Sequence, residues 1–179
     1  VEAGADVDHV ASDGTSAVQL AMYQKDFGFA TRMIQRGADV HAFDRNGNTL
    51  LHAAVLADQP SLVSMLLAKG ANPNLLTGSP GVKRRYEVNY RSDPYEEQYK
   101  PPLLLAAENG FAGVMRALVE GGADVKYRSA EGTNIVLAAA MSGKLSALEL
   151  ALQWLPDPNT ADASGQTALH LLLQGDGGT

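Results

Sequence analysis

Cysteine is absent from the sequence, tryptophan occurs once, and aromatic residues make up only 6% of the chain. The lack of cysteine excludes disulfide bonds, thiolate metal sites and a cysteine nucleophile. It does not indicate a compartment, because it fits the cytosol, the periplasm and secretion alike. No stretch approaches the roughly 18 apolar residues of a membrane-spanning helix, so we expect no membrane insertion.

Basic residues are in the minority. The chain has 14 Lys and Arg against 20 Asp and Glu, a formal net charge of -6 and a pI near 5.1. Binding to nucleic acid depends on clustered Lys and Arg that release counterions from the phosphates. An anionic membrane surface attracts the same residue types. We therefore expect neither nucleic acid nor an anionic membrane as a partner.

Residue patterns that carry catalysis or metal binding are also missing. His9 and His41 fall near the bases of successive loops, but no carboxylate motif accompanies them, so they make a poor zinc site. The glycine-rich segment 175–178 follows an unfinished helical pattern, whereas a phosphate-binding loop precedes a helix. We predict no enzymatic activity, no metal and no cofactor.

A short element of glycine, alanine and Asp or Asn recurs at a fixed interval. It begins at Gly4, Gly37, Gly70 and Gly122, with a degenerate copy at Leu155-Pro156-Asp157. The steps are 33, 33, 52 and 33 residues, so the odd step contains 19 additional residues. Carboxylates that keep this period are explained by architecture rather than as an acid/base pair; they are Asp6, Asp39, Asp124 and Asp157.

A second element keeps the same register. It reads Thr49-Leu50-Leu51-His52 in the best copy, and altered copies begin at Ser16, Pro101, Asn134 and Thr167. A 33-residue unit with these two elements resembles the ankyrin repeat, and the resemblance covers essentially all 179 residues. In that family the histidine of this element hydrogen-bonds loops of neighbouring units. The resemblance therefore implies structural roles for His52 and His170.

The resemblance implies an all-α fold, an ankyrin-type α-solenoid whose units each consist of helix, turn, helix and a projecting hairpin loop. It implies one ankyrin repeat domain, residues 1–179, with one insertion at about 78–99. The expected units are 1–10 (partial), 11–43, 44–76, 77–128, 129–161 and 162–179 (partial). Because the first and last units are incomplete, we expect further ankyrin repeats of the same chain beyond both ends.

Local signals fit such a unit. Polar residues are placed to cap the first helix of a unit, as Thr49 is, although Pro101 takes that place in one copy. In the best copy the second helix is predicted over 62–69. The glycine that follows the second helix, at 37, 70 and 122, suits a left-handed conformation that ends the helix. Residues 39–47 are predicted to form the hairpin loop, with Gly47 at its turn. In the last copy Trp154-Leu155-Pro156-Asp157-Pro158 departs from the pattern, and its prolines end the helix.

The connection between Asn74 and Pro101 has 26 residues and contains four of the six tyrosines. We expect a strand over 82–90 that lengthens the hairpin, and a short helix that Asp93 caps. Tyr and Arg are enriched at interface hot spots, and long loops in compact domains are often functional. The insertion is thus interpreted as a binding finger. A self-packed loop and an unstructured insertion are the alternatives.

The predicted function is that of a non-enzymatic module for protein–protein interaction, which binds a protein or peptide in its concave groove and through the Tyr-rich insertion. The alternative is a structural or targeting domain of a larger assembly or multidomain enzyme. Register within the repeat places Leu56, Ala57, Met141 and Ser142 along the groove. The candidate partner-binding residues are Tyr23, Arg45, Asn46, Arg84, Arg85, Tyr86, Tyr90, Tyr95, Tyr99, Glu108 and Asn109.

Overall fold

The computed structural model describes residues 17–41, 48–76, 100–129 and 131–175. This part of the chain folds into nine α-helices and contains no β-strand, apart from one isolated antiparallel bridge between Ala161 and Thr167. The predicted all-α fold is therefore confirmed. The helices are α1 (Ala17–Tyr23), α2 (Phe27–Gln35), α3 (Leu50–Leu56), α4 (Pro60–Ala68), α5 (Pro102–Asn109), α6 (Ala112–Glu120), α7 (Ile135–Ser142), α8 (Leu145–Trp154) and α9 (Ala168–Gly175).

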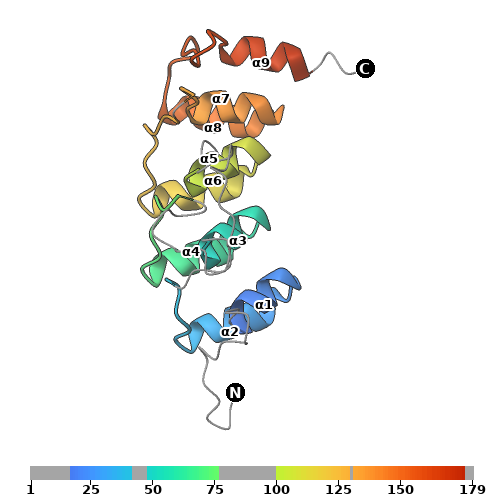
Figure 1. The fold of residues 1–179 in the computed structure, drawn as a ribbon, viewed down its shortest axis with the longest axis vertical. Helices are drawn as coiled ribbons and strands as arrows, with labels where there is room; N and C mark the ends of the chain where they lie inside the picture. The colour runs from blue at the N-terminus through green and yellow to red at the C-terminus, as the bar shows by residue number, and fades with distance from the viewer. Residues whose placement is uncertain (1–16, 42–47, 77–99, 130, 176–179) are drawn as a thin grey trace, which may run out of the picture.

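The helices form an elongated stack of antiparallel pairs, which runs from α1 and α2 to α9 (Figure 1). The first helix of each pair packs on the first helix of the next, in the order α1, α3, α5, α7 and α9. The second helices make a parallel series of contacts from α2 through α4 and α6 to α8. We call these series the first-helix layer and the second-helix layer. No unit closes a core alone, because each buries its apolar side chains against the next unit.

Capping side chains and prolines determine where the helices begin. The Asn134 Oδ1 atom accepts a hydrogen bond from the backbone N–H of Leu137 at 3.0 Å, as predicted for an N-cap. Helix α4 begins at Pro60, so the predicted start at residue 62 was two residues late. Proline suits the first turn of a helix because its missing N–H would have no partner there.

Glycines end the second helices by a common geometry. Gly37 has a φ of 96°, its N–H donates to the Ile34 carbonyl at 3.0 Å, and the N–H of Ala38 reaches back to the Met33 carbonyl at 3.1 Å. This pair of bonds satisfies carbonyls at the helix end, and the positive φ favours glycine. The same geometry follows α4 and α6, where the φ values are 95° at Gly70 and 98° at Gly122.

Periodic Asp and Asn side chains shape the loops that leave the second helices. Each accepts a backbone hydrogen bond from the residue two positions later, at 2.8 to 3.0 Å. Such bonds hold a turn without the help of other segments. The described members of this series therefore have structural roles, and they are Asp39, Asn72, Asp124 and Asp157.

The hairpin loops are described best at the C-terminal end of the stack. There the N–H of Ser129 donates to the Thr133 carbonyl at 2.9 Å, and one repeat later the N–H of Asp162 donates to the Gln166 carbonyl at 3.0 Å. The N–H of Ala163 donates to the Glu131 carbonyl at 2.8 Å, so successive loops are joined. Residues 42–47 of the loop predicted at 39–47 lie outside the described residues.

Candidate functional site

Three of the candidate partner-binding residues belong to the described part of the chain: Tyr23, Glu108 and Asn109. Glu108 and Asn109 lie side by side at the end of α5, whereas Tyr23 lies two first helices away, at the end of α1. The other eight candidates lie outside the described residues, as do the strand and the short helix predicted in the insertion. They are Arg45, Asn46, Arg84, Arg85, Tyr86, Tyr90, Tyr95 and Tyr99.

A row of side chains runs along the first-helix layer. Tyr23, Leu56, Glu108 and Met141 occupy one register position, in the last turn of α1, α3, α5 and α7. Tyr23 is 55% exposed, Leu56 53% and Met141 56%, whereas Glu108 is partly buried. Most large apolar residues of these helices are buried. We call these four residues the register row.

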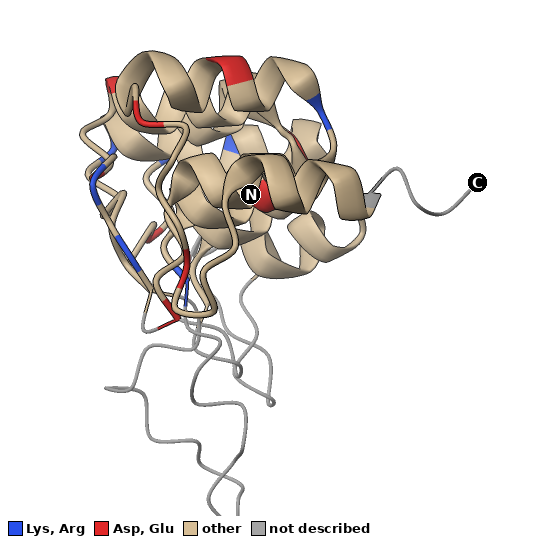
Figure 2. Cartoon of the chain, turned by 90° about the horizontal axis from the view of Figure 1, so that it is seen from above, with Lys and Arg blue, Asp and Glu red and all other residues tan. Residues whose placement is uncertain are grey.

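The first-helix layer is almost free of charge. In α1, α3, α5, α7 and α9 the only Asp, Glu, Lys or Arg residue is Glu108. Seen along the stack, the helical ribbons are mostly tan, and charges of both signs gather on the connecting segments at one side (Figure 2). The register row thus lies on an apolar face that has a single anionic position in it.

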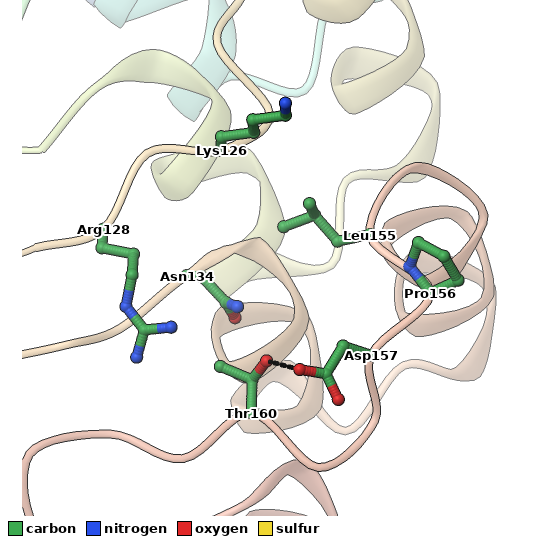
Figure 3. A pocket seen from close by; sticks show the side chains of 7 residues that line it. All are labelled: Lys126, Arg128, Asn134, Leu155, Pro156, Asp157 and Thr160. Carbon is green, nitrogen blue, oxygen red and sulfur yellow. Dashed lines mark hydrogen bonds between the residues drawn. The ribbon is translucent and has the colours of Figure 1, made fainter.

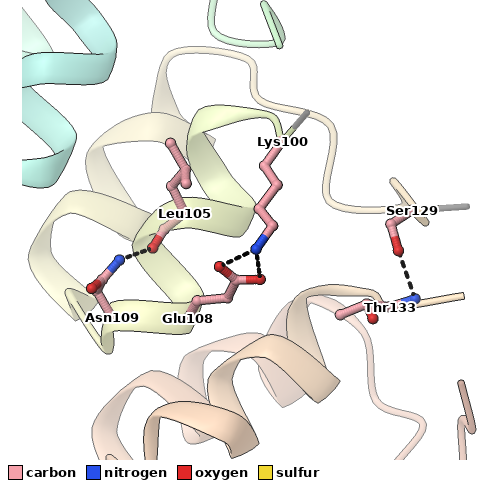
Figure 4. Close-up of polar contacts among 6 residues, drawn as sticks. All are labelled: Lys100, Leu105, Glu108, Asn109, Ser129 and Thr133. Carbon is pink, nitrogen blue, oxygen red and sulfur yellow. Dashed lines mark hydrogen bonds and ion pairs between the residues drawn. The ribbon is translucent and has the colours of Figure 1, made fainter. Parts of the chain in front are cut away.

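An ion pair occupies the centre of this face. The Lys100 Nζ atom lies 2.8 Å from both carboxylate oxygens of Glu108, while the Asn109 side chain donates to the Leu105 carbonyl at 2.8 Å (Figure 4). The side chains of Lys100 and Glu108 are 30% and 19% exposed. A pair so placed contributes at most about 1 kcal/mol, because water and salt screen it. The pair also fixes the point at which the insertion rejoins the repeat, because Lys100 directly follows the insertion.

The other end of the insertion is held by His52. The His52 Nδ1 atom accepts a hydrogen bond from the Thr49 N–H at 3.0 Å, so the proton of the neutral ring lies on Nε2. That Nε2 atom donates to the Leu75 carbonyl at 2.7 Å. His52 is 1% exposed, so this bond is shielded from water. The structural role expected of His52 is confirmed, and the connection leaves α4 and enters α5 from fixed points.

The described ranges also bear on metal binding and acid/base chemistry. They contain no group of three or more His, Cys, Asp or Glu side chains that could hold a metal ion. None of their helices is both long and apolar enough to cross a bilayer. The pKa of the Asp157 carboxyl is lowered by the hydrogen bond from the Thr160 hydroxyl and then by the N–H of Asn159. Both contacts belong to a turn, so this shift reflects loop structure rather than acid/base chemistry.

Sequence reasoning missed Leu20, which is 49% exposed. It precedes Tyr23 by three residues on α1, and residues three apart share one face of a helix. Helical spacing from Tyr23 would have found it. Its position extends the apolar face by one side chain at the N-terminal end of the stack.

Comparisons with known proteins agree with this architecture. A family model described as three copies of the ankyrin repeat matches residues 1–77. Rabankyrin-5 of Homo sapiens is 27% identical over 164 residues, which are 90% of this chain and 13% of that protein. The human transient receptor potential cation channel subfamily A member 1 is 29% identical over 132 residues, which are 73% of this chain and 10% of the channel protein.

A third relative is an enzyme by name, the glycerophosphocholine phosphodiesterase of Schizosaccharomyces pombe. It is 30% identical over 113 residues, which are 63% of this chain and 8% of the phosphodiesterase. The chain therefore spans only 8 to 13% of the lengths of these three proteins. Most of each relative's length is therefore unmatched.

Proposed function

The chain is an ankyrin repeat protein, and from that premise we propose that its first-helix layer binds a protein or peptide partner in the groove beside the hairpin loops. Ankyrin repeats are in general modules of protein–protein interaction. The observation that carries the proposal is the register row: three large apolar side chains, each more than half exposed, at one position of successive units. Regularly placed exposed apolar residues favour an interaction surface over scattered ones.

The spacing of the row limits the shape of the partner. Packed helices lie about 8–10 Å apart, so the row from Tyr23 to Met141 extends over roughly 24–30 Å. A partner segment of that length, with apolar side chains at intervals of about 10 Å, matches it. Such a segment is uncharged where it meets Leu56 and Met141, because no charged residue of α3 or α7 is available to pair with it.

Lys100 and Glu108 supply the polar contact. They interrupt the apolar row between Leu56 and Met141, so a partner must present a donor to Glu108 or an acceptor to Lys100 at that point. Because a mismatched polar group buried against this pair loses its hydrogen bonds to water, the pair selects among partners more than it adds affinity. Asn109, whose side chain is already bonded to the Leu105 carbonyl, borders this contact.

The insertion is proposed to add a second contact. Its Tyr86, Tyr90, Tyr95 and Tyr99, with Arg84 and Arg85, are residue types that recur at interface hot spots. The attachment of the insertion supports this proposal, since Lys100 ties one end of it to the register row and the Leu75 carbonyl ties the other end to α3. Arg45 and Asn46 are proposed to contribute from the loop before α3.

Quantitative capture of partners on the immobilised protein tests the groove. A double variant, Leu56→Ala with Met141→Ala, removes two members of the register row. Leu145→Ala is the matched control, because Leu145 is 66% exposed but begins α8 in the second-helix layer. We expect a partner whose affinity falls about tenfold or more with the double variant and does not change with Leu145→Ala. Equal retention by both variants would refute groove binding.

Deletion of residues 78–99 tests the insertion separately. Loss of the partner, with thermal unfolding unchanged, supports a binding finger. Tyr90→Ala refines the result: a finger predicts weaker capture at an unchanged melting temperature, whereas a self-packed loop predicts a lower melting temperature. Capture that does not change after the deletion argues against the finger and leaves the groove as the binding site.

A second candidate function is that of a targeting or structural domain within a larger protein. The chain's small share of its relatives' lengths favours it, because one relative is named as a channel and another as a phosphodiesterase. In that case the register row faces another part of the same polypeptide or assembly. Cross-linking from residue 56 in the full-length protein distinguishes the two, since intramolecular cross-links support the second candidate and intermolecular ones the first.

A further inference from the structure

A pocket of about 260 Å³ opens where the loop after α6 meets the loop after α8 (Figure 3). It lies beside the loops that join successive units, away from the register row. Its wall combines cationic, polar and apolar groups from three segments of the chain. The lining residues are Lys126, Arg128, Asn134, Leu155, Pro156, Asp157 and Thr160.

The pocket is a departure from the repeat pattern. At the preceding junction, Asn74 holds the register position of Lys126, and its side chain joins the two loops: Oδ1 accepts from the Asp124 N–H at 2.7 Å, and Nδ2 reaches the Gly122 carbonyl at 3.4 Å. At the later junction the N–H of Asp157 donates to the Leu155 carbonyl at 2.8 Å instead. Here the long cationic side chain of Lys126 stands in place of the short bridging side chain of Asn74. Leu155 and Pro156 stand in place of the glycine and alanine of the preceding unit.

The Asn134 side chain, which lines this pocket, uses only part of its hydrogen-bonding capacity. Asn134 is only 4% exposed, and its Oδ1 atom is fixed by the Leu137 N–H, which also determines the orientation of the carboxamide. Its Nδ2 atom donates to no acceptor within the described ranges. In Figure 3 the carboxamide points toward Thr160 and Asp157 across the pocket. Because the Nδ2 atom itself is open to solvent at the pocket, a ligand acceptor placed here would replace water as its hydrogen-bond partner.

The charges of the pocket specify that acceptor. Lys126 makes no ion pair with any described residue, and Arg128 donates from Nη2 to the Ala161 carbonyl at 2.8 Å, which leaves its other N–H groups free to bind. The Asp157 carboxylate is already engaged, by the Thr160 hydroxyl at 2.7 Å and the Asn159 N–H at 3.0 Å. Two cations against one anion leave a single positive charge, and Leu155 and Pro156 add an apolar wall.

We propose that this pocket binds a carboxylate carried on an apolar stem. The carboxylate accepts from the Lys126 ammonium, the Arg128 guanidinium and the Asn134 Nδ2 group, while the stem packs on Leu155 and Pro156. A phosphate dianion fits less well, because its second charge meets the Asp157 carboxylate. Both a glutamate side chain of a partner protein and a C-terminal carboxylate have the required chemistry. The site is independent of the groove proposed above, because it shares no residue with the register row.

Titration of the 179-residue chain followed by ¹H–¹⁵N NMR tests the site. N-acetyl-glutamate N-methylamide represents the side-chain source and N-acetyl-leucine the C-terminal one. N-acetyl-glutamine N-methylamide is the neutral control, and inorganic phosphate is the competing anion. We expect saturable shifts with one or both acids at the Asn134 carboxamide and at the backbone amides of Leu155, Asp157, Asn159 and Thr160. The acid that binds more tightly identifies the source.

Two variants and one control identify the contacts. Lys126→Met removes an exposed cation, and Asn134→Thr installs the residue that occupies this register before α3 and α9, which removes the amide donor. Each is expected to weaken binding of the preferred acid about tenfold. Lys69→Met, an exposed lysine at the end of α4, should bind as the unmodified protein does. Should Asn134→Thr fail to fold, Lys126→Met still decides the result.

Four outcomes would overturn the proposal. They are no saturable shift with either acid, equal binding of the neutral glutamine probe, tighter binding of phosphate than of both acids, and equal effects of Lys126→Met and Lys69→Met. None of them bears on the groove, because Lys126→Met leaves the register row intact. Loss of groove binding in Leu56→Ala with Met141→Ala likewise leaves this pocket in place.

Discussion

Helices α5 and α9 hold the same place in their repeats, yet their side chains meet different surroundings. Leu103 of α5 and Leu169 of α9 are in the same register, and they are 1% and 63% exposed. Ala107 and Leu173 are a second such pair, at 0% and 63%. Helix α5 packs against α3, α6, α7 and α8, whereas the main contact of α9 is α7 (Figure 1).

The comparison shows that burial in this protein is decided by neighbouring units and not by the helix sequence alone. Both helices have eight residues and a run of leucines, so their intrinsic helix preferences are similar. What α9 lacks, within the described part of the chain, is a second helix paired with it. Stability in a stack of repeats is close to a sum of unit and interface contributions, and substitutions should therefore have effects that depend on position in the stack.

The largest effect is expected for Leu103→Ala compared with Leu169→Ala. Leu103 is enclosed on all sides, so its truncation leaves a cavity and should lower the free energy of unfolding by about 2–5 kcal/mol. The same substitution at Leu169 should change it by less than about 0.5 kcal/mol, as is usual on a surface. Urea denaturation of both variants measures the difference. Equal losses would show that α9 is covered as α5 is.

A smaller effect is expected for His52→Ala compared with His170→Ala. Both rings accept a hydrogen bond from the N–H of a threonine, Thr49 or Thr167, at 3.0 Å. His52 is buried and also donates to the Leu75 carbonyl, so its loss strands polar groups away from water and should cost about 1–3 kcal/mol. His170 is exposed, and water can replace it. If thermal denaturation showed the two variants to be equally destabilised, the anchor at Leu75 would be energetically unimportant.

Gly132→Ala compared with Gly143→Ala examines the joined loops. Both glycines have positive φ values, 82° and 69°, so alanine at either costs about 1–2 kcal/mol of backbone strain. A Cβ atom on Gly132 would also lie 3.0 Å from the Ala163 backbone nitrogen. A Cβ atom on Gly143 would have no heavy atom of another part of the chain within 4 Å. Gly132→Ala should therefore be the more destabilising of the two in urea denaturation. The reverse order would argue against contact between the loops.

Much of the fold was predictable because the two repeated elements report the period directly. Gly37, Gly70 and Gly122 were predicted to end the second helices, and each has the positive φ that this requires. The start of α4 was misplaced because the apolar pattern begins at Leu62, whereas the helix begins with the proline two residues earlier. Apolar periodicity predicts which residues form the buried face of a helix, but it does not predict a first turn that faces water.

The candidate site was less predictable. Register alone placed Tyr23, Leu56, Glu108 and Met141 in one row, because every unit repeats the same geometry. The ion pair between Lys100 and Glu108 could not be predicted. It joins the end of an insertion to a helix, and the 33-residue period does not relate the positions of the two residues. The pocket beside Asn134 was not predictable for a similar reason. It arises where Lys126 and Leu155 differ from the residues at the same positions of the preceding repeat, and the repeat pattern does not predict the geometry of residues that differ from it.

The smallest effect is expected for Asp162→Asn as the pH changes. The pKa of the Asp162 carboxyl is lowered first by the Ser164 hydroxyl, at 2.6 Å, and then by the Gln166 N–H, at 3.0 Å. The ionised carboxylate therefore stabilises the loop at pH values above its unfolded pKa of about 3.9. This contribution is lost as the pH falls through the lower folded pKa. The melting temperatures of the variant and the unmodified protein should thus converge in acid, and a widening gap would contradict the assignment.

Native-state hydrogen exchange along the stack tests most directly whether each helix is stabilised by its neighbouring units. The amides of α5 and α7, which have neighbouring units on both sides, should exchange most slowly, and those of α9 should exchange faster even though its sequence is as rich in leucine. Equal protection of α5, α7 and α9 would contradict this account, because it would indicate one cooperative core in place of stacked units.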